Sequence, residues 1–288
     1  MSLNPRLAVI GGSGLYQFDD LKDVTSVEVN TPFGAPSSPI TIGLLKQKPV
    51  AFLARHGQGH IYSPSKVPYQ ANIYALKSLG VKYIISVSAC GSLREAYAPG
   101  HIVIPDQIFD FTHLRKRSFF DSGLVAHVSV AEPFCNQLSS DLEQSIKSTD
   151  AAYHRDGTFI TIEGPRFSTK GESHLYRQWG LDIIGMTASP EAFLAREAEM
   201  CYATMAHVTD YDVWHISEET VTVEMVIKTL LKNVNLAQEI IKKLVDIIDT
   251  ESDCDCHHAL KNAIITNREN IDKEKQQDLA LFIDKYLA

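Results

Sequence analysis

Short apolar runs that are typical of buried strands alternate with helical segments along this chain, and this alternation restricts the fold more than any other feature. Leu7–Ile10, Val50–Ala54, Tyr83–Val87 and Cys201–Ala206 are such runs, whereas Tyr69–Leu79 repeats its apolar residues at helical spacing. Strands that alternate with helices form a sheet covered by helices. We therefore predict an α/β protein with three layers, in which helices flank a central mixed β-sheet.

The remaining elements extend this pattern toward the C-terminus. Further strands are expected at Pro39–Gly43, Ile102–Asp106, Thr158–Ile162 and Asp182–Thr187, and further helices at Ala192–Met200, Thr220–Ile248 and Ile271–Leu287. The chain becomes polar after Ile248, and the last helix is charged and amphipathic. We expect one domain over residues 1–266 and a tail helix within 267–288 that packs on this domain or on a neighbouring subunit.

Charge and composition exclude several classes of partner. A net charge of −8 argues against nucleic acid, which needs a basic surface. The one tight basic cluster, Arg115–Arg117, is expected to lie in a solvated loop. No apolar run is long enough to span a membrane. No signal-peptide pattern precedes the first strand, and five cysteines fit a reducing compartment, so we expect a cytoplasmic protein.

Two acidic residues follow the strand that begins at Cys201. Asp210 and Asp212 stand one residue apart at its end, where ligands bind in open α/β sheets. They can meet a ligand there, or they can cap a helix or form a turn, for which Asp is common. Both interpretations stay open on this stretch alone.

Three other strand ends carry groups suited to an anion. Ser13 lies in a glycine-rich turn, Arg55 and His56 follow a strand, and Ser88 lies among small residues. Backbone amides beside glycine, hydroxyls and a guanidinium are all donors to phosphate. The first two sites also have plain alternatives, namely a tight turn for Ser13 and a surface Arg beside a packed His for Arg55 and His56. We interpret their recurrence at successive strand ends as an anion site.

Phe167 and the C-terminal cysteines leave alternatives open. Phe167 follows a rigid Gly-Pro turn, and its ring can stack on a flat ligand or pack in the core. Cys254 and Cys256 precede His257 and His258, but this spacing is unusual for zinc. A reduced surface loop is the interpretation that we prefer over redox activity or metal binding, and we expect no metal.

Nine short blocks, in a fixed order, resemble a known family. They are Gly11–Leu15, Thr31–Gly34, Ala54–Gly57, Tyr69–Asn72, Ser88–Ser92, Ala131–Cys135, Glu163–Ser168, Gly185–Thr187 with Pro190–Glu191, and Thr209–Asp212. The chain resembles the S-methyl-5′-thioadenosine phosphorylases, in the trimeric branch of the purine nucleoside phosphorylase superfamily. This resemblance implies a nucleoside phosphorylase domain over residues 1–266, a homotrimer or a dimer of trimers, and no cofactor beyond phosphate as co-substrate.

The resemblance also implies an activity, which is the phosphorolysis of S-methyl-5′-thioadenosine to adenine and 5-methylthioribose 1-phosphate in purine and methionine salvage. The implied phosphate contacts are Ser13, Arg55, His56, Ser88, Ala89 and Thr187. The implied substrate contacts are Phe167, Ser168, Met186, Asp210, Asp212, Val223, Val226 and Ile227, together with His127 in a neighbouring subunit's site. Asp210 is the implied catalytic acid, because departing adenine needs a proton.

Two rival functions are weighed against this one. A broader purine nucleoside phosphorylase would act on adenosine, inosine or methylthioinosine, and an apolar pocket discriminates against an added hydroxyl only about 10²-fold. A regulatory nucleotide-binding module would bind without turnover. Phosphate-dependent release of the base separates all three.

Overall fold

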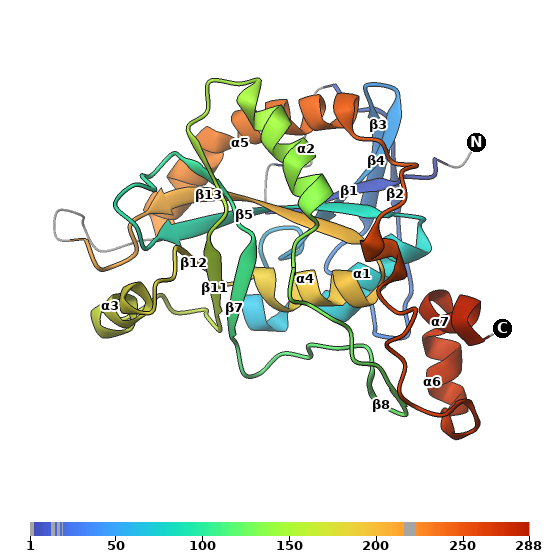
Figure 1. Cartoon of the computed structure of the whole chain (residues 1–288). Coiled ribbons are helices and arrows are strands. Elements are labelled where there is room, and N and C mark those ends of the chain that lie inside the picture. The colour runs from blue at the N-terminus through green and yellow to red at the C-terminus, as the bar shows by residue number, and fades with distance from the viewer. Residues whose placement is uncertain (1–2, 13–14, 16–17, 19, 216–222, 288) are drawn as a thin grey trace.

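The computed structural model describes residues 3–12, 15, 18, 20–215 and 223–287, and for residues 223–232 it describes the backbone only. A twisted sheet crosses the middle of the molecule, with helices on both of its faces (Figure 1). The strands are β1 (Leu7–Gly11), β2 (Lys22–Val27), β3 (Ile40–Leu45), β4 (Lys48–Ala54), β5 (Tyr83–Ser92), β6 (Ile102–Ile104), β7 (Gln107–Phe111), β8 (Asp121–Ser122), β9 (Leu124–Val125), β10 (Tyr153–Arg155), β11 (Thr158–Ile162), β12 (Ile183–Gly185) and β13 (Cys201–Asp210).

The helices lie between these strands and after the last of them. They are α1 (Tyr69–Ser78), α2 (Asn136–Lys147), α3 (Lys170–Gln178), α4 (Ala188–Glu197), α5 (Val223–Ile247), α6 (Lys273–Asp278) and α7 (Ala280–Leu287), with short 3₁₀ turns at Pro64–Lys66, Asp255–His258 and Arg268–Asn270. Among the described residues, none of these helices combines the length and the apolar character that crossing a membrane requires.

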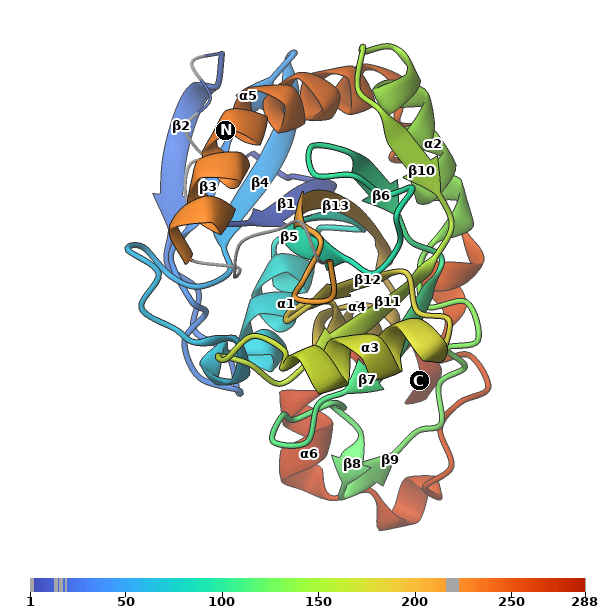
Figure 2. The ribbon, with the colours of Figure 1, turned by 90° about the vertical axis from the view of Figure 1, so that its left-hand side faces the viewer.

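The sheet is mixed, as predicted. Its strands follow the order β10-β6-β13-β5-β1-β4-β3-β2, and β12, β11 and β7 branch from β5 in that sequence. The central strands β4, β1, β5 and β13 run parallel to one another, while β3 pairs antiparallel with β4 and β12 pairs antiparallel with β5. Figure 2, viewed from the side toward which β5 and β13 point, shows the branch with β12, β11 and β7 folding away from the main sheet.

Alternate residues of the central strands pack against helices on opposite faces of the sheet. This arrangement confirms the three-layer prediction. Leu7 and Val9 of β1 belong to the cluster that packs under α2 and α5. Ala8 and Ile10 belong to the opposite cluster, with side chains of α1 and α4. Successive side chains of a strand point to opposite faces, so a strand covered on both sides is apolar throughout.

The C-terminal tail differs from the single helix that the sequence predicts. The structure divides it into α6 and α7, which are separated at Leu279. Leu279, Phe282 and Ile283 are buried in the same cluster as the side chains of α1. The ring of Phe282 lies 4.8 Å from that of Phe119. The tail therefore packs on its own chain, because its apolar side chains complete a core that α1 and α4 leave open.

Candidate active site

The carboxyl ends of four parallel strands meet at one edge of the sheet, toward which β5 and β13 point in Figure 1. The strand register pairs Ile10 of β1 with Leu53 of β4 and with Ser86 of β5. It also pairs Ser88 of β5 with Ala206 of β13. Polar residues that follow these strands are therefore neighbours in space, as the sequence predicts for an anion site.

Arg55 is buried beneath this edge rather than exposed on it. Its guanidinium pairs in bidentate fashion with Glu191, at 2.7 and 2.8 Å, and also donates to the Ser86 hydroxyl at 2.7 Å. The carboxylate of Glu191 also accepts a bond from Tyr202. Glu191 raises the pKa of Arg55, although burial opposes the shift. The surface alternative for Arg55 is therefore wrong, and most of its donors already have protein partners.

Hydroxyl groups connect Arg55 to the strand ends. The Ser86 hydroxyl lies 3.3 Å from that of Ser88, which lies 3.4 Å from that of Thr187. Thr187 is the N-cap residue of α4, but its side chain makes no capping bond. Its hydroxyl is therefore not engaged by the helix backbone. This arrangement suits an anion that accepts from Ser88 and Thr187.

His56 stands next to Arg55 with one ring nitrogen engaged. Its Nδ1 lies 2.9 Å from the Tyr62 carbonyl, and its ring stacks on His60 with centroids 4.2 Å apart. A carbonyl only accepts, so Nδ1 carries the hydrogen and Nε2 carries a lone pair. Burial and the charge of Arg55 lower the pKa of His56 to about 4. The imidazole is therefore neutral near pH 7.

Asp210 forms a turn, as one of its two sequence interpretations predicts. It also lies at the carboxyl end of β13, where the other interpretation places a ligand. Its Oδ1 accepts from the backbone amide of Asp212 at 2.8 Å, and its Oδ2 accepts from the Thr209 hydroxyl at 2.6 Å. A side chain that bonds to an amide two residues later is an Asx turn. A Cβ on Gly91 would approach Oδ1 of Asp210 to 3.0 Å. The turn therefore fixes the carboxylate over β5, and the two interpretations are compatible.

Asp212 is more deeply buried than Asp210. Only 6% of it is exposed, and its φ of 51° is in the left-handed region. Burial raises the pKa of Asp212, and the nearby hydroxyls of Ser173 and Ser168 oppose the rise. Ser168 and Asp212 thus lie together, although they are distant in the sequence. The geometry places Asp212 against α3 and behind the turn at Asp210.

The predicted contacts with base and ribose come from two loops that touch each other. Gly164, with φ of 63°, leaves no room for a Cβ, which would approach Sδ of Met186 to 2.6 Å. Phe167 is half-buried in the same loop, and Ala89 is half-buried on β5. The side-chain arrangement is compatible with a flat ligand over Met186, but the roles of Phe167 and Ala89 remain predictions.

Arg115 corrects the expectation of a solvated basic loop. Its side chain is 1% exposed and donates to the carbonyls of Met186 and Ser189 at 2.7 Å each, and of Glu163 at 2.8 Å. Hydrogen bonds from the His113 amide and the Ser65 hydroxyl hold the pKa of Glu163 at about 2, although burial opposes the shift. Arg115 therefore joins the two loops that carry the predicted substrate contacts. Nothing in the spacing of the basic cluster signals this role.

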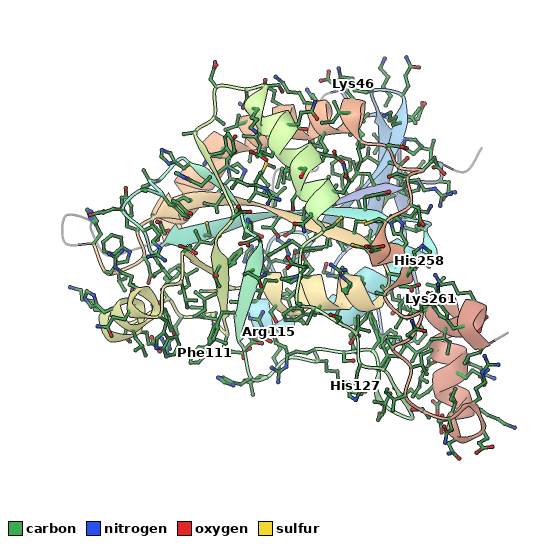
Figure 3. All side chains as sticks on the ribbon, in the orientation of Figure 1. Lys46, Phe111, Arg115, His127, His258 and Lys261 are labelled. Carbon is green, nitrogen blue, oxygen red and sulfur yellow. The ribbon has the colours of Figure 1, made fainter. Side chains whose placement is uncertain are left out.

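Several predicted residues are not tested by this geometry. Ser13 lies outside the described residues, and so do the side chains of Val223, Val226 and Ile227, whose backbone forms the start of α5. His127 is exposed beside the C-terminal segment, to whose Ala263 carbonyl its backbone amide donates. Figure 3 shows it far from the strand ends of its own chain, so its predicted role depends on a neighbouring subunit.

The cysteines contradict the expectation of a surface loop. Cys256 is buried, and Cys254 lies within reach of two cysteines from other parts of the chain, Cys135 and Cys201. Sequence reasoning missed this group because the four residues come from three separate segments. Their position, at the amino end of β13, is opposite to the edge described above.

Comparison with known proteins shows which family this chain resembles. Residues 6–246 match the model of the phosphorylase superfamily. A protein of Chloroflexus aurantiacus that is named S-methyl-5′-thioadenosine phosphorylase is 53% identical, over 97% of this chain and 98% of its own length. The protein of that name from Gloeobacter violaceus is 50% identical over 98% and 96%.

Solved structures agree with these relatives. A methylthioadenosine phosphorylase from an antarctic soil metagenomic library superposes with a TM-score of 0.93 at 48% identity, covering 98% of this chain and all of that one. A mutant adenosine/methylthioadenosine phosphorylase from Schistosoma mansoni, in complex with methylthioadenosine, gives a TM-score of 0.83 at 37% identity, over 89% and 96%.

Proposed function

The chain belongs to the phosphorylase superfamily and, within it, to the family of its S-methyl-5′-thioadenosine phosphorylase relatives, and from this premise we propose its reaction. Phosphate cleaves S-methyl-5′-thioadenosine to adenine and 5-methylthioribose 1-phosphate. The observation that carries the proposal is the convergence, at one sheet edge, of the Ser88–Thr187 hydroxyl pair and the Asp210 carboxylate. The first suits an anion, and the second suits the edge of an aminopurine.

The phosphate half of the site works by orientation and charge. Ser88 and Thr187 donate to the phosphate oxygens, and Arg55 holds Ser86 in place beside Ser88. Phosphate bound beside the anomeric carbon needs no strong base, because positioning and electrostatic stabilisation provide most of the rate. Arg55 contributes mainly through position, since Glu191 already occupies two of its donors.

His56 orients the phosphate by accepting a hydrogen bond. Its Nε2 lone pair accepts a hydrogen bond from a hydroxyl of the phosphate ion, because Nδ1 already donates to Tyr62. This hydrogen bond orients the phosphate toward the ribose, and the proton stays on the phosphate because an imidazole with a pKa of about 4 is a weak base. The lowered pKa of His56 keeps the acceptor available through the physiological range.

Asp210 serves the departing base. Adenine leaves with negative charge on its ring, and a carboxyl group that donates a proton to ring nitrogen 7 assists it by roughly 10²–10⁴-fold. The same group, when it accepts from the exocyclic amine, prefers adenine to a 6-oxopurine. The Asx turn holds the carboxyl in place at the strand edge.

Two further features belong to this proposal. We expect salvage of purine and methionine in the cytoplasm, by a homotrimer in which His127 reaches a neighbour's site. Exposed apolar side chains on β7 and α3, namely Phe109, Leu175 and Trp179, support self-association. We expect Val223, Val226 and Ile227 to line the methylthio pocket, because an apolar wall accepts a thioether more readily than a hydroxyl.

A broader nucleoside phosphorylase is the second candidate, since the Schistosoma mansoni relative is named for adenosine as well as methylthioadenosine. A panel of methylthioadenosine, adenosine, inosine and methylthioinosine separates the two. The primary proposal predicts the highest kcat/KM for methylthioadenosine, with adenosine lower by on the order of 10²-fold. Equal values for the 6-amino and 6-oxo substrates would favour the broader enzyme.

A further inference from the structure

Four of the five cysteines gather at the edge of the sheet opposite to the active site. Cys135 precedes α2, Cys201 begins β13, and Cys254 and Cys256 lie in the segment after α5. Their Sγ atoms all lie within 4.8 Å of one another, and three of the four residues are buried. The fifth cysteine, Cys90, lies apart from this group on β5. Four converging thiols offer one complete set of ligands.

The spacing of the sulfur atoms suits a tetrahedral cation better than a disulfide. Sγ of Cys135 and Sγ of Cys254 are 3.7 Å apart. A zinc ion at its usual bond length of about 2.3 Å separates neighbouring thiolates by roughly 3.8 Å. A disulfide needs about 2.05 Å, so closing one would pull the two sulfurs together by well over an ångström.

One backbone amide and one helix end favour a thiolate at Cys135. The backbone amide of Leu138 donates to Sγ of Cys135 at 3.5 Å, and Cys135 is the N-cap of α2, whose positive end faces it.

We propose that Cys135, Cys201, Cys254 and Cys256 bind one thiophilic divalent cation, of the zinc class, in a closed structural site. Each thiol that binds releases its proton to solvent, and no atom changes oxidation state. Four protein ligands leave no open position, which is the mark of a structural rather than a catalytic site.

The position of this cysteine site indicates what it stabilises. Nine residue steps of β13 separate Cys201 from Asp210, which is roughly 30 Å of strand. Figure 1 shows the start of β13 beside the C-terminal segment, on the far side from the strand tips. The cation would therefore tie α2, β13 and the segment that leads to α6 and α7 into one unit, without touching the substrate.

Cobalt binding tests the proposal directly. The full-length protein is reduced with a phosphine, stripped by a chelator without oxygen, and titrated with Co²⁺. We expect intense visible bands of tetrahedral cobalt and a sulfur-to-cobalt charge-transfer band, saturating at about one ion per chain. Zn²⁺ should abolish both signals by displacing the cobalt, and bound metal should raise Tm by several degrees.

Matched variants assign the ligands. Cys254→Ser/Cys256→Ser should lose the cobalt bands, whereas Cys90→Ala should retain them. Cys254→His exchanges one ligand for another, so it should keep stoichiometric binding with shifted bands, and this rescue guards against a double variant that fails to fold. Circular dichroism checks the fold of each protein.

Two results would overturn the proposal. One is a folded wild-type protein with four free thiols in this group and no cobalt spectrum. The other is a disulfide between any two of these four cysteines in protein that is alkylated directly in the lysate, because paired sulfurs cannot complete the ligand set.

Discussion

The guanidinium of Arg55 is buried together with the carboxylate of Glu191, so a change at either residue affects folding as well as phosphate binding. Arg55→Ala leaves a buried carboxylate without its partner, which costs about 3–5 kcal/mol. We expect urea unfolding to show this loss. The double variant Arg55→Ala/Glu191→Ala should be less destabilised than the sum of the single variants. Additive losses would mean that the two side chains do not stabilise each other.

His56 gives the stability of the protein a defined pH dependence. Its pKa is about 4 in the fold and about 6.5 in the unfolded chain, so the unfolded state binds the extra proton first as pH falls. The contribution of the neutral ring is complete above pH 6.5 and is lost as pH falls toward 4, by up to roughly 3 kcal/mol.

His56→Gln removes this titration. The unfolding free energy of the variant should therefore fall less steeply between pH 6.5 and 4 than that of the wild type, in parallel urea series. The control is His258→Gln, since His258 is an exposed side chain that pairs with Asp253. If the slopes of wild type and His56→Gln coincide, then His56 is not a buried neutral ring.

Asp210→Asn tests the role of the acid. Asn keeps the size of Asp but cannot deliver an acidic proton, and its amide can rotate to donate to a 6-oxo group. We expect adenine release to slow by on the order of 10²–10⁴-fold, with relative preference moving toward methylthioinosine and inosine. An unchanged ratio of kcat/KM for amino and oxo substrates, with normal adenine release, would leave Asp210 as a turn residue only.

Among the elements, the loop that carries Arg115 determines how two substrate loops meet. Arg115→Ala removes bonds to the carbonyls of Met186, Ser189 and Glu163. Each buried acceptor that is left without a partner costs about 1–3 kcal/mol. We expect a lower Tm and a higher KM for the nucleoside, because both loops loosen.

Arg117 provides the matched control for this prediction. It lies two residues away with an exposed side chain that is paired only loosely with Asp110. Surface substitutions of this kind change stability by about 0.5 kcal/mol or less. If Arg115→Ala behaves like Arg117→Ala in thermal unfolding and in KM, Arg115 does not organise the loops.

The sequence predicts strands well where both of their faces are buried, and poorly where the strand is exposed. The apolar runs of β1, β4, β5 and β13 are covered on both faces, so the prediction finds all four. Strand β2 is largely exposed and lacks this signal. Helix α3 was missed although Thr169 and Glu172 form a capping box, a recognisable start signal. Helix α2 begins at Asn136, and its N-cap residue, Cys135, gives no such signal.

For the molecule as a whole, contacts between distant segments are what the sequence alone does not reveal. The convergence of anion donors follows from the strand order, so it could be predicted. The partners Arg55 and Glu191 lie 136 residues apart, and neither the burial of Arg115 nor the gathering of the cysteines has a local pattern. Buried ionic and sulfur groups depend on the tertiary fold.

The measurement that tests the central claim most directly is the phosphate dependence of base release from S-methyl-5′-thioadenosine. The purified protein is assayed with and without inorganic phosphate, and both products are quantified. We predict that adenine and 5-methylthioribose 1-phosphate form in equal amounts, and that neither forms without phosphate. Adenine release at the same rate without phosphate, with free methylthioribose as the sugar product, would contradict the account.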